Sequence, residues 1–291
     1  MTASNPTNPN NPTHPTKPTD PTNPSWTGMV PVDDTALAVT DTGGPGCPVV
    51  YLNGAYASQR HWRHVIGELG AGLRHITFDE RARGRSGQSA DYSFEACVRD
   101  VDAVLDARGV HRAIVVGWSY GAATAVHWAE RNPDRTMGVV CADGGLPYGL
   151  TGEEGQERIR TLFRKMRFLL PLVRPFGLAA RMSADQHAEV NIEVNQVHAD
   201  LAPVLDRVTV PVRYVLATDG NLGGGDEEME EARASLDPVI ARNPNIRVSS
   251  KVPSNHSHIL RKDFRTVAAV VRELATASDR TAAPPHDGLT D

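Results

Sequence analysis

The chain carries the run Gly117-Trp118-Ser119-Tyr120-Gly121 between an apolar segment, residues 113–116, and a segment of small residues that begins at Ala122. A short apolar run predicts a buried strand, and the glycines after it predict a sharp turn. The following segment is expected to be helical. In this order of strand, turn and helix, the hydroxyl of Ser119 is left exposed at the tip of the turn. The five-residue pattern alone is common, so the flanking segments carry most of this prediction.

Short apolar strands and helical segments alternate on both sides of this turn. From residue 48 onward they form repeated β-α-β units, which predict an α/β fold with a mostly parallel, eight-stranded sheet and helices on both faces. Active sites in such sheets lie at the carboxyl ends of the strands. The expected strands are residues 28–31, 35–41, 48–52, 74–78, 112–116, 136–142, 211–217 and 246–252. The expected helices are residues 59–69, 93–108, 120–132, 227–242 and 263–276.

One segment interrupts the alternation. No strand is apparent from residue 147 to residue 207, so we expect an all-helical lid inserted after the sixth strand. Its apolar residues recur at helical spacing, which predicts either a face packed on the sheet or, together with Leu172, Phe176 and Leu178, the lining of a substrate pocket. The apolar positions are Ile159, Leu162, Phe163, Met166 and Leu170, and the basic positions between them are Arg158, Arg160, Arg164, Lys165 and Arg167.

Both ends of the chain lack the pattern of a folded domain. Prolines recur at every third residue from Pro6 to Pro24, which is the repeat of a solvated polyproline II helix. We therefore expect a disordered tail there, and a second one at the other end. The expected domains are a Pro-rich tail (1–25), an α/β core (26–146 and 208–276), a helical lid (147–207) and a second tail (277–291).

Composition excludes several functional classes. The 291-residue chain has 40% apolar and 22% charged residues, as ordinary globular proteins do, and its net charge of -5 lacks the basic excess of nucleic-acid-binding proteins. No apolar run approaches the roughly 18 residues of a membrane span, and no signal peptide is recognisable. Cys47, Cys97 and Cys141 are odd in number and widely spaced, so they predict neither a disulfide framework nor a metal site. We expect a cytoplasmic protein without a nucleic-acid partner.

Four segments in the right order make the chain resemble the α/β-hydrolase fold superfamily over residues 26–276. The first is the turn at Ser119. Residues 49–55 look like the strand and loop that end in His-Gly in many members, and residues 78–87 are similar to their Asp-x-Arg-Gly-x-Gly-x-Ser turn. Residues 255–260 follow the last strand, where the family has its catalytic histidine.

A serine hydroxyl is a poor nucleophile and needs a base within hydrogen-bond reach, for which an imidazole is suited at neutral pH. The resemblance assigns this base to His256, because family members have apolar residues three and four places after their histidine, and Ile259 and Leu260 stand there. His258 lies two residues on and would face away from Ser119 in an extended segment.

The oxyanion of a tetrahedral intermediate needs two preorganised donors. The resemblance assigns them to the backbone N–H groups of Tyr120 and Ala55. Asn53 replaces the usual histidine of the loop before Ala55, which leaves the anchoring of that loop open. Asp79 and Arg81 are charged residues in a turn, and we interpret them as structural.

The acid that orients the histidine has two candidates. Family members usually carry it after the seventh strand, where Asp219 stands, and a minority carry it after the sixth strand, where Asp143 stands. Many members also hold a noncatalytic aspartate at the position of Asp143. Asp226 is better explained as the N-cap of the following helix. The choice between Asp219 and Asp143 stays open at this point.

The resemblance implies a serine hydrolase that cleaves a carboxylic ester, thioester or lactone through an acyl-enzyme on Ser119, without a metal or organic cofactor. Halide displacement and epoxide opening on this fold use an aspartate at that position. A cofactor-free lyase, cyclase or carbon–carbon hydrolase, or a ligand-binding protein that retains the triad, stays open because fold and triad do not fix the reaction. The expected partner is a small molecule with an apolar portion, and the basic lid face could dock an acidic carrier protein.

Overall fold

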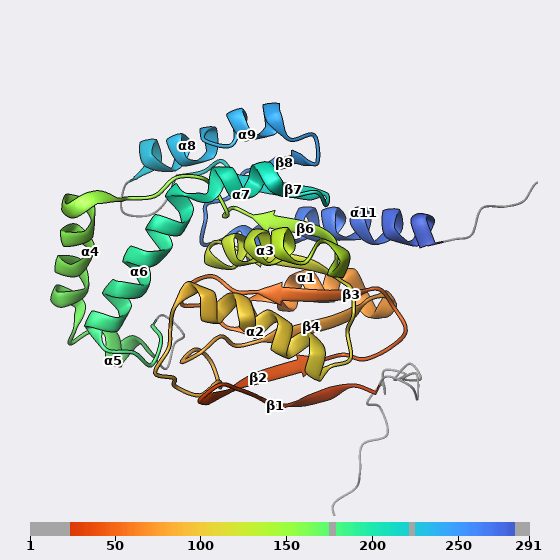
Figure 1. Cartoon of the computed structure of the whole chain (residues 1–291), viewed down its shortest axis with the longest axis horizontal. Coiled ribbons are helices and arrows are strands. Elements are labelled where there is room, and N and C mark those ends of the chain that lie inside the picture. Colours follow the sequence, from red (N-terminus) through yellow and green to blue (C-terminus); the bar gives the residue numbers. More distant parts are fainter. Residues whose placement is uncertain (1–23, 175–178, 221–224, 283–291) are drawn as a thin grey trace, which may run out of the picture.

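Eight strands form a single sheet with helices on both faces (Figure 1). This computed structural model describes residues 24–174, 179–220 and 225–282. The strand order is β1-β2-β4-β3-β5-β6-β7-β8; β2 is antiparallel to both of its neighbours, and all other pairs are parallel. The strands are β1 (Trp26–Val32), β2 (Thr35–Asp41), β3 (Pro48–Leu52), β4 (Arg74–Phe78), β5 (Ala113–Trp118), β6 (Thr136–Ala142), β7 (Val212–Ala217) and β8 (Ile246–Val252).

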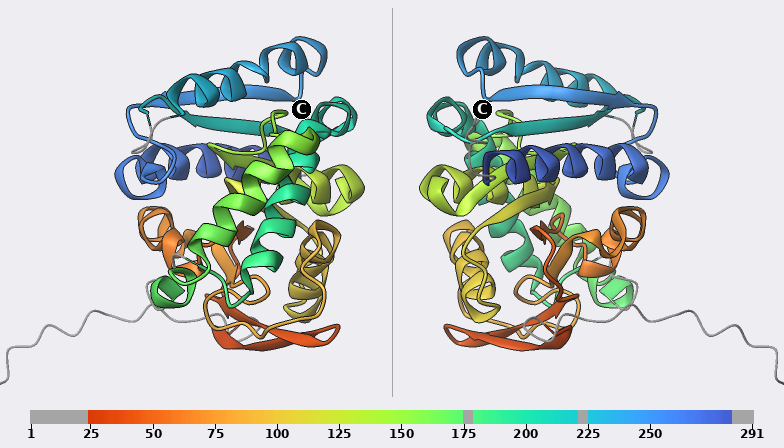
Figure 2. Two further views of the ribbon diagram at one scale, coloured as in Figure 1. Left: turned by 90° about the vertical axis from the view of Figure 1, so that its left-hand side faces the viewer. Right: turned by 90° about the vertical axis from the view of Figure 1, so that its right-hand side faces the viewer.

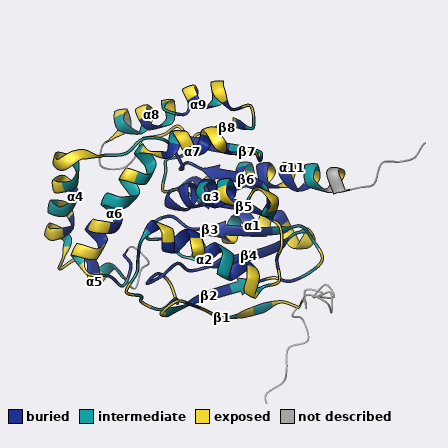
Figure 3. Cartoon of the chain, viewed as in Figure 1, coloured by how far each residue is buried: buried dark blue, intermediate teal, exposed yellow. Residues whose placement is uncertain are grey.

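The central strands are apolar throughout because both faces of the sheet are covered. In β5, Val115 packs into the core on one face, whereas Ile114 and Val116 pack into the core on the other. Successive side chains of a strand point to opposite faces, so a strand buried on both faces has to be apolar at every position. Figure 3 shows these central strands as buried, with exposed residues on the outer helices, the loops and the edge strands β1 and β8. The predicted mostly parallel sheet is confirmed.

The helices divide between the two faces. Residues of α2, α3 and α7 contribute to the core on one face, and residues of α1 and α11 contribute to the core on the other (Figures 1 and 2). The helices are α1 (Arg63–Leu69), α2 (Phe94–Ala107), α3 (Tyr120–Arg131), α4 (Gly152–Met166), α5 (Leu170–Val173), α6 (Ala184–Ala199), α7 (Leu201–Arg207), α8 (Asp226–Ala234), α9 (Asp237–Arg242), α10 (Ile259–Lys262) and α11 (Phe264–Ala282). Short 3-10 turns are η1 (Gln59–Trp62), η2 (Gly70–Gly72) and η3 (Pro133–Arg135).

The chain between β6 and β7 is helical, and α4, α5 and α6 stand together at one end of the sheet (Figure 1). That end holds the carboxyl end of β3, because the side-chain amide of Asn191 in α6 donates to the hydroxyl of Tyr56, just beyond β3, at 2.7 Å. These helices therefore lie where the active sites of parallel sheets are found.

The apolar side of α4 packs against α6 and not on the sheet. Ile159 and Phe163 are buried in this contact, but Leu162 is 52% exposed and Leu172 is 68% exposed. The buried face of α4 is therefore narrower than the spacing of its apolar residues predicted. A single helix, α6, packs on α4 and covers only part of its apolar side. Phe176 and Leu178, two of the expected pocket residues, lie outside the described residues.

Several boundaries differ from the sequence prediction. The segment expected to form one helix over residues 227–242 is two helices, because Pro238 stands in the first turn of α9 and cannot continue the ladder of α8. Gly225, not Asp226, occupies the N-cap position of α8. The last helix continues beyond residue 276 to Ala282, in a stretch without Gly or Pro. Residues 1–23 and 283–291, which carry most of the two expected tails, lie outside the described residues.

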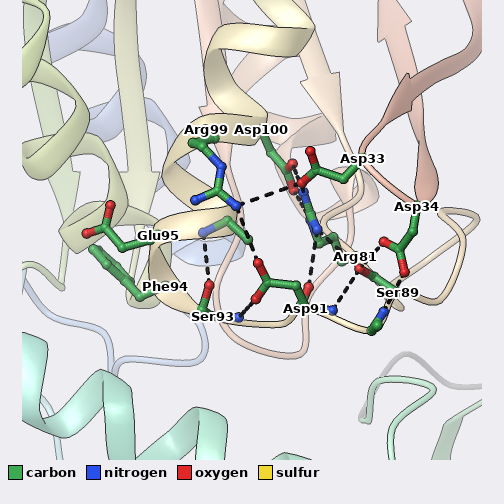
Figure 4. A network of polar contacts seen from close by, with 12 residues as sticks. Asp33, Asp34, Arg81, Ser89, Asp91, Ser93, Phe94, Glu95, Arg99 and Asp100 are labelled. Atoms are coloured by element: carbon green, nitrogen blue, oxygen red, sulfur yellow. Dashed lines mark hydrogen bonds and ion pairs between the residues drawn. The ribbon is translucent and has the colours of Figure 1, made fainter.

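The turn after β4 is held by a buried arginine (Figure 4). The guanidinium of Arg81 donates to both carboxylate oxygens of Asp100 at 2.8 and 2.7 Å and to Asp33 at 2.7 Å. Asp79 accepts from the backbone N–H groups of Gln59 and Arg85 at 2.8 and 2.9 Å. These contacts join the turn to neighbouring segments of the protein, which agrees with a structural role for Asp79 and Arg81.

In the three described stretches of the chain, no helix combines the length and apolar character that crossing a bilayer demands.

Candidate active site

Ser119 lies in a strained turn between β5 and α3. Its backbone has φ 56° and ψ -119°, a conformation that costs a non-glycine residue about 1–3 kcal/mol. The glycines on either side permit the turn: a Cβ on Gly117 would overlap the backbone of Gly121, and a Cβ on Gly121 would overlap the carbonyl of Leu52. The strand, turn and helix predicted from the sequence therefore present Ser119 at the carboxyl end of the sheet.

His256 lies in the loop between β8 and α10, and its Nε2 is 2.9 Å from Oγ of Ser119. The indole of Trp118 holds this loop, because its Nε1–H donates to the carbonyl of His256 at 3.1 Å and its ring lies 5.8 Å from the imidazole. His258, the alternative base, is the N-cap residue of α10, and its backbone N–H donates to Oδ1 of Asn255 at 3.1 Å.

Asp143 follows β6, and its Oδ2 lies 3.0 Å from Nδ1 of His256. Its backbone φ is 42°, and its side chain is fully buried. Oδ1 accepts the backbone N–H of Ala217 at 3.0 Å, and Arg233 reaches both carboxylate oxygens at 3.2 Å. Burial by itself raises the pKa of Asp143, but hydrogen bonds from His256 and Arg233 outweigh it and leave that pKa below its ordinary value.

The low pKa of Asp143 fixes the tautomer of His256. A carboxylate can only accept hydrogen bonds, so Nδ1 of His256 carries the proton and donates it. Nε2 then has a free lone pair and accepts from the hydroxyl of Ser119. The structure thus brings Ser119, His256 and Asp143 into one hydrogen-bonded chain.

Asp219, the other candidate acid, follows β7 and is exposed. Its backbone N–H donates to the carbonyl of Ser254 at 3.0 Å, which ties the turn after β7 to the turn after β8. The carboxylate that accepts the hydrogen bond from Nδ1 of His256 is that of Asp143.

Asn53 anchors the loop that follows β3. Its side-chain amide donates to the carbonyl of Phe78 at 2.7 Å and to Glu80 at 2.8 Å, while its Oδ1 accepts from Trp62 Nε1 at 2.9 Å. Its backbone N–H also donates to Glu80, at 2.8 Å. Burial raises the pKa of Glu80 to about 7 against these hydrogen bonds. Asn53, which stands where the resemblance led us to expect a histidine, therefore anchors the loop after β3.

Ala55 lies two residues beyond this anchor. Its carbonyl accepts from Nε of Arg83 at 2.9 Å, which fixes the orientation of the loop. A Cβ built on Gly54 would come within 3.4 Å of the Cβ of Ser119, so the loop passes close to the serine. Tyr120 is the first residue of α3, where backbone N–H groups have no partner within the helix. The loop of Ala55 thus passes close to Ser119, and Tyr120 follows Ser119 directly in the chain.

Arg233 was not identified from the sequence. It is a single arginine in a helix rich in acidic residues, and no motif marks it. The Trp118 contact with His256 was also missed, although the aromatic position inside the five-residue run was a visible signal. A cavity of about 480 Å³ adjoins Arg233 and is lined by the end of β7, by α8 and by β8; neither Ser119 nor His256 is among its lining residues.

Within the residues that the structure covers, no group of three or more His, Cys, Asp or Glu side chains is arranged to hold a metal ion.

Comparison with known proteins identifies the family. Residues 48–199, just over half of the chain, match the sequence profile of the family described as alpha/beta hydrolase fold. A haloalkane dehalogenase from Mesorhizobium japonicum is 30% identical over 141 residues, which cover 48% of this chain and 46% of that protein. Epoxide hydrolase B from Mycobacterium tuberculosis is 40% identical over 109 residues, 36% of this chain and 31% of that protein. The chain therefore matches less than half of the length of either relative.

A solved structure shows the same fold over a longer stretch. A thermophilic esterase from Thermogutta terrifontis superposes with a TM-score of 0.67 at 19% identity, over 88% of this chain and 99% of that one. The profile match and the observed strand order agree, and the chain belongs to the α/β-hydrolase fold family.

Proposed function

We propose that the protein is a serine hydrolase that cleaves a carboxylic ester, thioester or lactone through an acyl-enzyme on Ser119. The observation that carries this proposal is the hydrogen-bonded chain from Ser119 Oγ to His256 Nε2 at 2.9 Å and from His256 Nδ1 to Asp143 Oδ2 at 3.0 Å. Nucleophile, base and orienting acid in this order are what acyl transfer to a serine requires.

In the first half-reaction, Oγ of Ser119 bonds to the carbonyl carbon while its proton passes to Nε2 of His256. Collapse of the tetrahedral intermediate breaks the bond to the leaving oxygen or sulfur, which takes the proton from Nε2. Water then attacks the acyl-enzyme in the same manner and releases the carboxylic acid and free Ser119. Asp143 stays ionised throughout and stabilises the imidazolium that forms twice per turnover.

The oxyanion is assigned to the backbone N–H groups of Tyr120 and Ala55. The first lies at the positive end of the α3 dipole, and the second lies in the loop that Asn53 and Arg83 hold in place. Donors that are fixed before the reaction stabilise the developing charge without reorganisation, and one such donor contributes about 10²–10³ in kcat.

A serine nucleophile favours carbonyl substrates over the halides and epoxides named for the two relatives. An alkoxide that displaced a halide or opened an epoxide would leave an alkyl ether on Ser119. An ether has no carbonyl carbon for water to attack, so the enzyme would not be regenerated. An acyl ester on Ser119, in contrast, is hydrolysed by the same His256 and the same oxyanion donors that formed it.

Exposed basic side chains on α4 could bind an acidic carrier protein that delivers the acyl group as a thioester. Arg158 and Lys165 are exposed, while Arg160 and Arg164 pair with Glu189 and Glu157 at 3.3 and 3.6 Å. An acidic carrier protein that delivers a thioester would be attracted to this surface. Its kcat/KM should fall steeply as salt rises, whereas hydrolysis of a small neutral thioester should not; salt-independent kinetics with the carrier would contradict the docking.

The direct test compares Ser119→Ala with the wild type. The wild-type protein should hydrolyse a short p-nitrophenyl ester and should be labelled covalently by a fluorophosphonate, and Ser119→Ala should do neither. His256→Gln should lose both activities, while the matched control His258→Gln should keep them. Ester hydrolysis that survives Ser119→Ala would overturn the assignment of the nucleophile.

A further inference from the structure

Arg233 approaches the acid of the active site from α8. Its Nε lies 3.2 Å from Oδ1 of Asp143 and its Nη2 lies 3.2 Å from Oδ2, so the planar guanidinium spans both oxygens of the carboxylate. The Arg233 side chain is 15% exposed and that of Asp143 is fully buried. This pair is separate from the two hydrogen bonds that link Asp143, His256 and Ser119.

The carboxylate of Asp143 needs more than one donor to hold its plane. The torsion that rotates a carboxylate is broad, with two equivalent orientations. The backbone N–H of Ala217 fixes Oδ1 at 3.0 Å but leaves rotation about that contact free. A two-pronged guanidinium removes this freedom, because rotation of the carboxylate would break both of its hydrogen bonds together.

The charge of Arg233 also matters before the reaction begins. When Nε2 of His256 accepts from Ser119, the imidazole carries only its Nδ1 proton, so without Arg233 the buried carboxylate of Asp143 would face an uncharged ring. An unpaired buried charge is strongly unfavourable, and such a group tends to become protonated. A protonated Asp143 would be able to donate to Nδ1 of His256, which would place the imidazole proton on Nε2 and block acceptance from Ser119.

We propose that Arg233 is a positioning residue of the active site, whose guanidinium holds the carboxylate of Asp143 so that Oδ2 faces Nδ1 of His256. This inference rests on the proposed function for its effect on turnover. The geometry between Asp143 and His256 can be measured without any substrate.

The cavity beside Arg233 makes an unusual test possible. Its volume is about 480 Å³, and its charged lining consists of Arg233 and Lys251 together with Glu230 and Asp237, so removal of Arg233 leaves two carboxylates against one ammonium group. Truncation of Arg233 to alanine would extend this cavity toward Asp143. A free guanidinium ion is small enough to enter and is attracted by the acidic lining, so it can take the place of the lost side chain.

The kinetic test compares Arg233→Met, Arg233→Lys and Arg233→Ala. Arg233→Met should lower kcat on a p-nitrophenyl ester by about 10- to 100-fold with KM within about twofold, less than the roughly 10⁴ of a wrong imidazole tautomer. Arg233→Lys keeps the positive charge but lacks the two parallel N–H donors of the guanidinium, so its kcat should lie between those of Arg233→Met and the wild type. Millimolar guanidinium should raise kcat of Arg233→Ala and leave Ser119→Ala inactive. Arg242→Met removes an exposed arginine on α9 that pairs with Asp206, and it should match the wild type.

The second test is a spectroscopic signature. The proton on Nδ1 of His256 points at a carboxylate and should give a low-field proton NMR signal, which His256→Gln assigns by its loss. Arg233→Met should shift or broaden this signal while the fold is retained, and guanidinium should restore it in Arg233→Ala. Wild-type kcat and an unchanged signal in Arg233→Met would overturn the proposal. If Arg233→Met does not fold, kcat and the NMR signal are measured in Arg233→Lys instead. Wild-type values of both in Arg233→Lys would then overturn the proposal.

The two proposals fail in different ways. If the wild type showed no Ser119-dependent hydrolysis, the proposed function would fall, and the NMR signal would still report whether Arg233 orders Asp143. If hydrolysis depended on Ser119 but neither kcat nor the signal responded to Arg233, only the positioning role would fall, and Arg233 would serve to attach α8 to the core.

Discussion

Asp143 and His256 lie 113 residues apart in the sequence, yet Oδ2 of Asp143 is 3.0 Å from Nδ1 of His256. The sheet creates this proximity, because the carboxyl ends of β6, β7 and β8 lie side by side and each is followed by a loop at the same edge. The positive φ of Asp143, 42°, is a conformation that few residues other than glycine adopt, and aspartate is among those that tolerate it. The acid that reaches the histidine is therefore the one after β6.

Asp143→Asn and Asp219→Asn should differ sharply in turnover. An asparagine at position 143 offers an N–H as readily as an oxygen to Nδ1 of His256 and favours the wrong tautomer, so kcat should fall by roughly 10⁴. Asp219 is exposed, and its contact with Ser254 uses the backbone, so Asp219→Asn should stay within about threefold of the wild type. Steady-state kinetics on one ester suffice; a large loss at Asp219 or equal losses at both positions would contradict this assignment.

Much of the fold could be predicted because its local signals agree. Short apolar runs such as β3 and β5 occur where strands are buried on both faces, and glycine-rich turns mark their ends. The boundaries that were missed depend on other effects. Pro238 divides α8 from α9, and the narrow buried face of α4 reflects the single helix that packs on it.

The sequence predicted Ser119 and His256 of the hydrogen-bonded chain but not all of the residues that contact it. Ser119 lies between the two glycines of a five-residue motif, and His256 is followed by apolar residues three and four places later, so both positions could be identified from the sequence. The acid could not be chosen, because Asp143 and Asp219 both follow strands of one edge and sequence does not give the direction of a side chain. Arg233 comes from a helix 90 residues after Asp143, and its contact depends entirely on tertiary packing.

Gly121→Ala should destabilise the protein strongly. A methyl group there would overlap the carbonyl of Leu52 and approach the carbonyl of Asn53 at 2.7 Å, and backbone atoms cannot move aside cheaply. We expect a loss of about 2–3 kcal/mol in the free energy of unfolding, measured by urea denaturation, together with lower kcat because the loop of Ala55 is displaced.

Gly67→Ala is the matched control. Gly67 lies inside α1, and no atom lies within 4 Å of a Cβ built there. This substitution should raise the free energy of unfolding by about 0.5–1 kcal/mol, because alanine favours the helix and restricts the unfolded chain. Equal effects of the two substitutions would show that close approach at Gly121 is unimportant.

Stability should fall in acid because of three histidines that are buried or partly buried. Burial lowers the pKa of His127, His187 and His198 to about 4. As pH drops below about 6.5, the unfolded chain binds protons at these sites and the native protein does not, so stability is lost from there down to about pH 4. His127 packs on Phe94 at 4.9 Å, and His127→Leu should reduce the loss between pH 7.5 and pH 5 by up to about 2 kcal/mol.

Urea denaturation at the two pH values measures this change. His111 is exposed, and His111→Leu should leave the difference in unfolding free energy between pH 7.5 and pH 5 as it is in the wild type. A His127→Leu variant whose stability depends on pH as steeply as that of the wild type would rule out His127 as a source of acid sensitivity.

Tyr56 and Asn191 should act as a coupled pair. The side-chain amide of Asn191 donates to the Tyr56 hydroxyl at 2.7 Å and to the carbonyl of His187 at 2.7 Å, so it ties the loop beside Ala55 to α6. Tyr56→Phe and Asn191→Ala should each lower kcat about three- to tenfold, since a hydrogen bond of this kind contributes about 1 kcal/mol. The double variant should lose little more than either single variant, because both remove the same contact.

A double-mutant cycle in kcat/KM gives the coupling free energy, which should be about 1 kcal/mol. Tyr148→Phe is the control, because its hydroxyl donates to exposed Glu231 of α8 at 3.3 Å, a contact other than the Tyr56–Asn191 hydrogen bond; it should combine additively with Asn191→Ala. Additive losses for Tyr56→Phe and Asn191→Ala would mean that the two side chains act separately. The helices between β6 and β7 would then not hold the loop of Ala55 through this hydrogen bond.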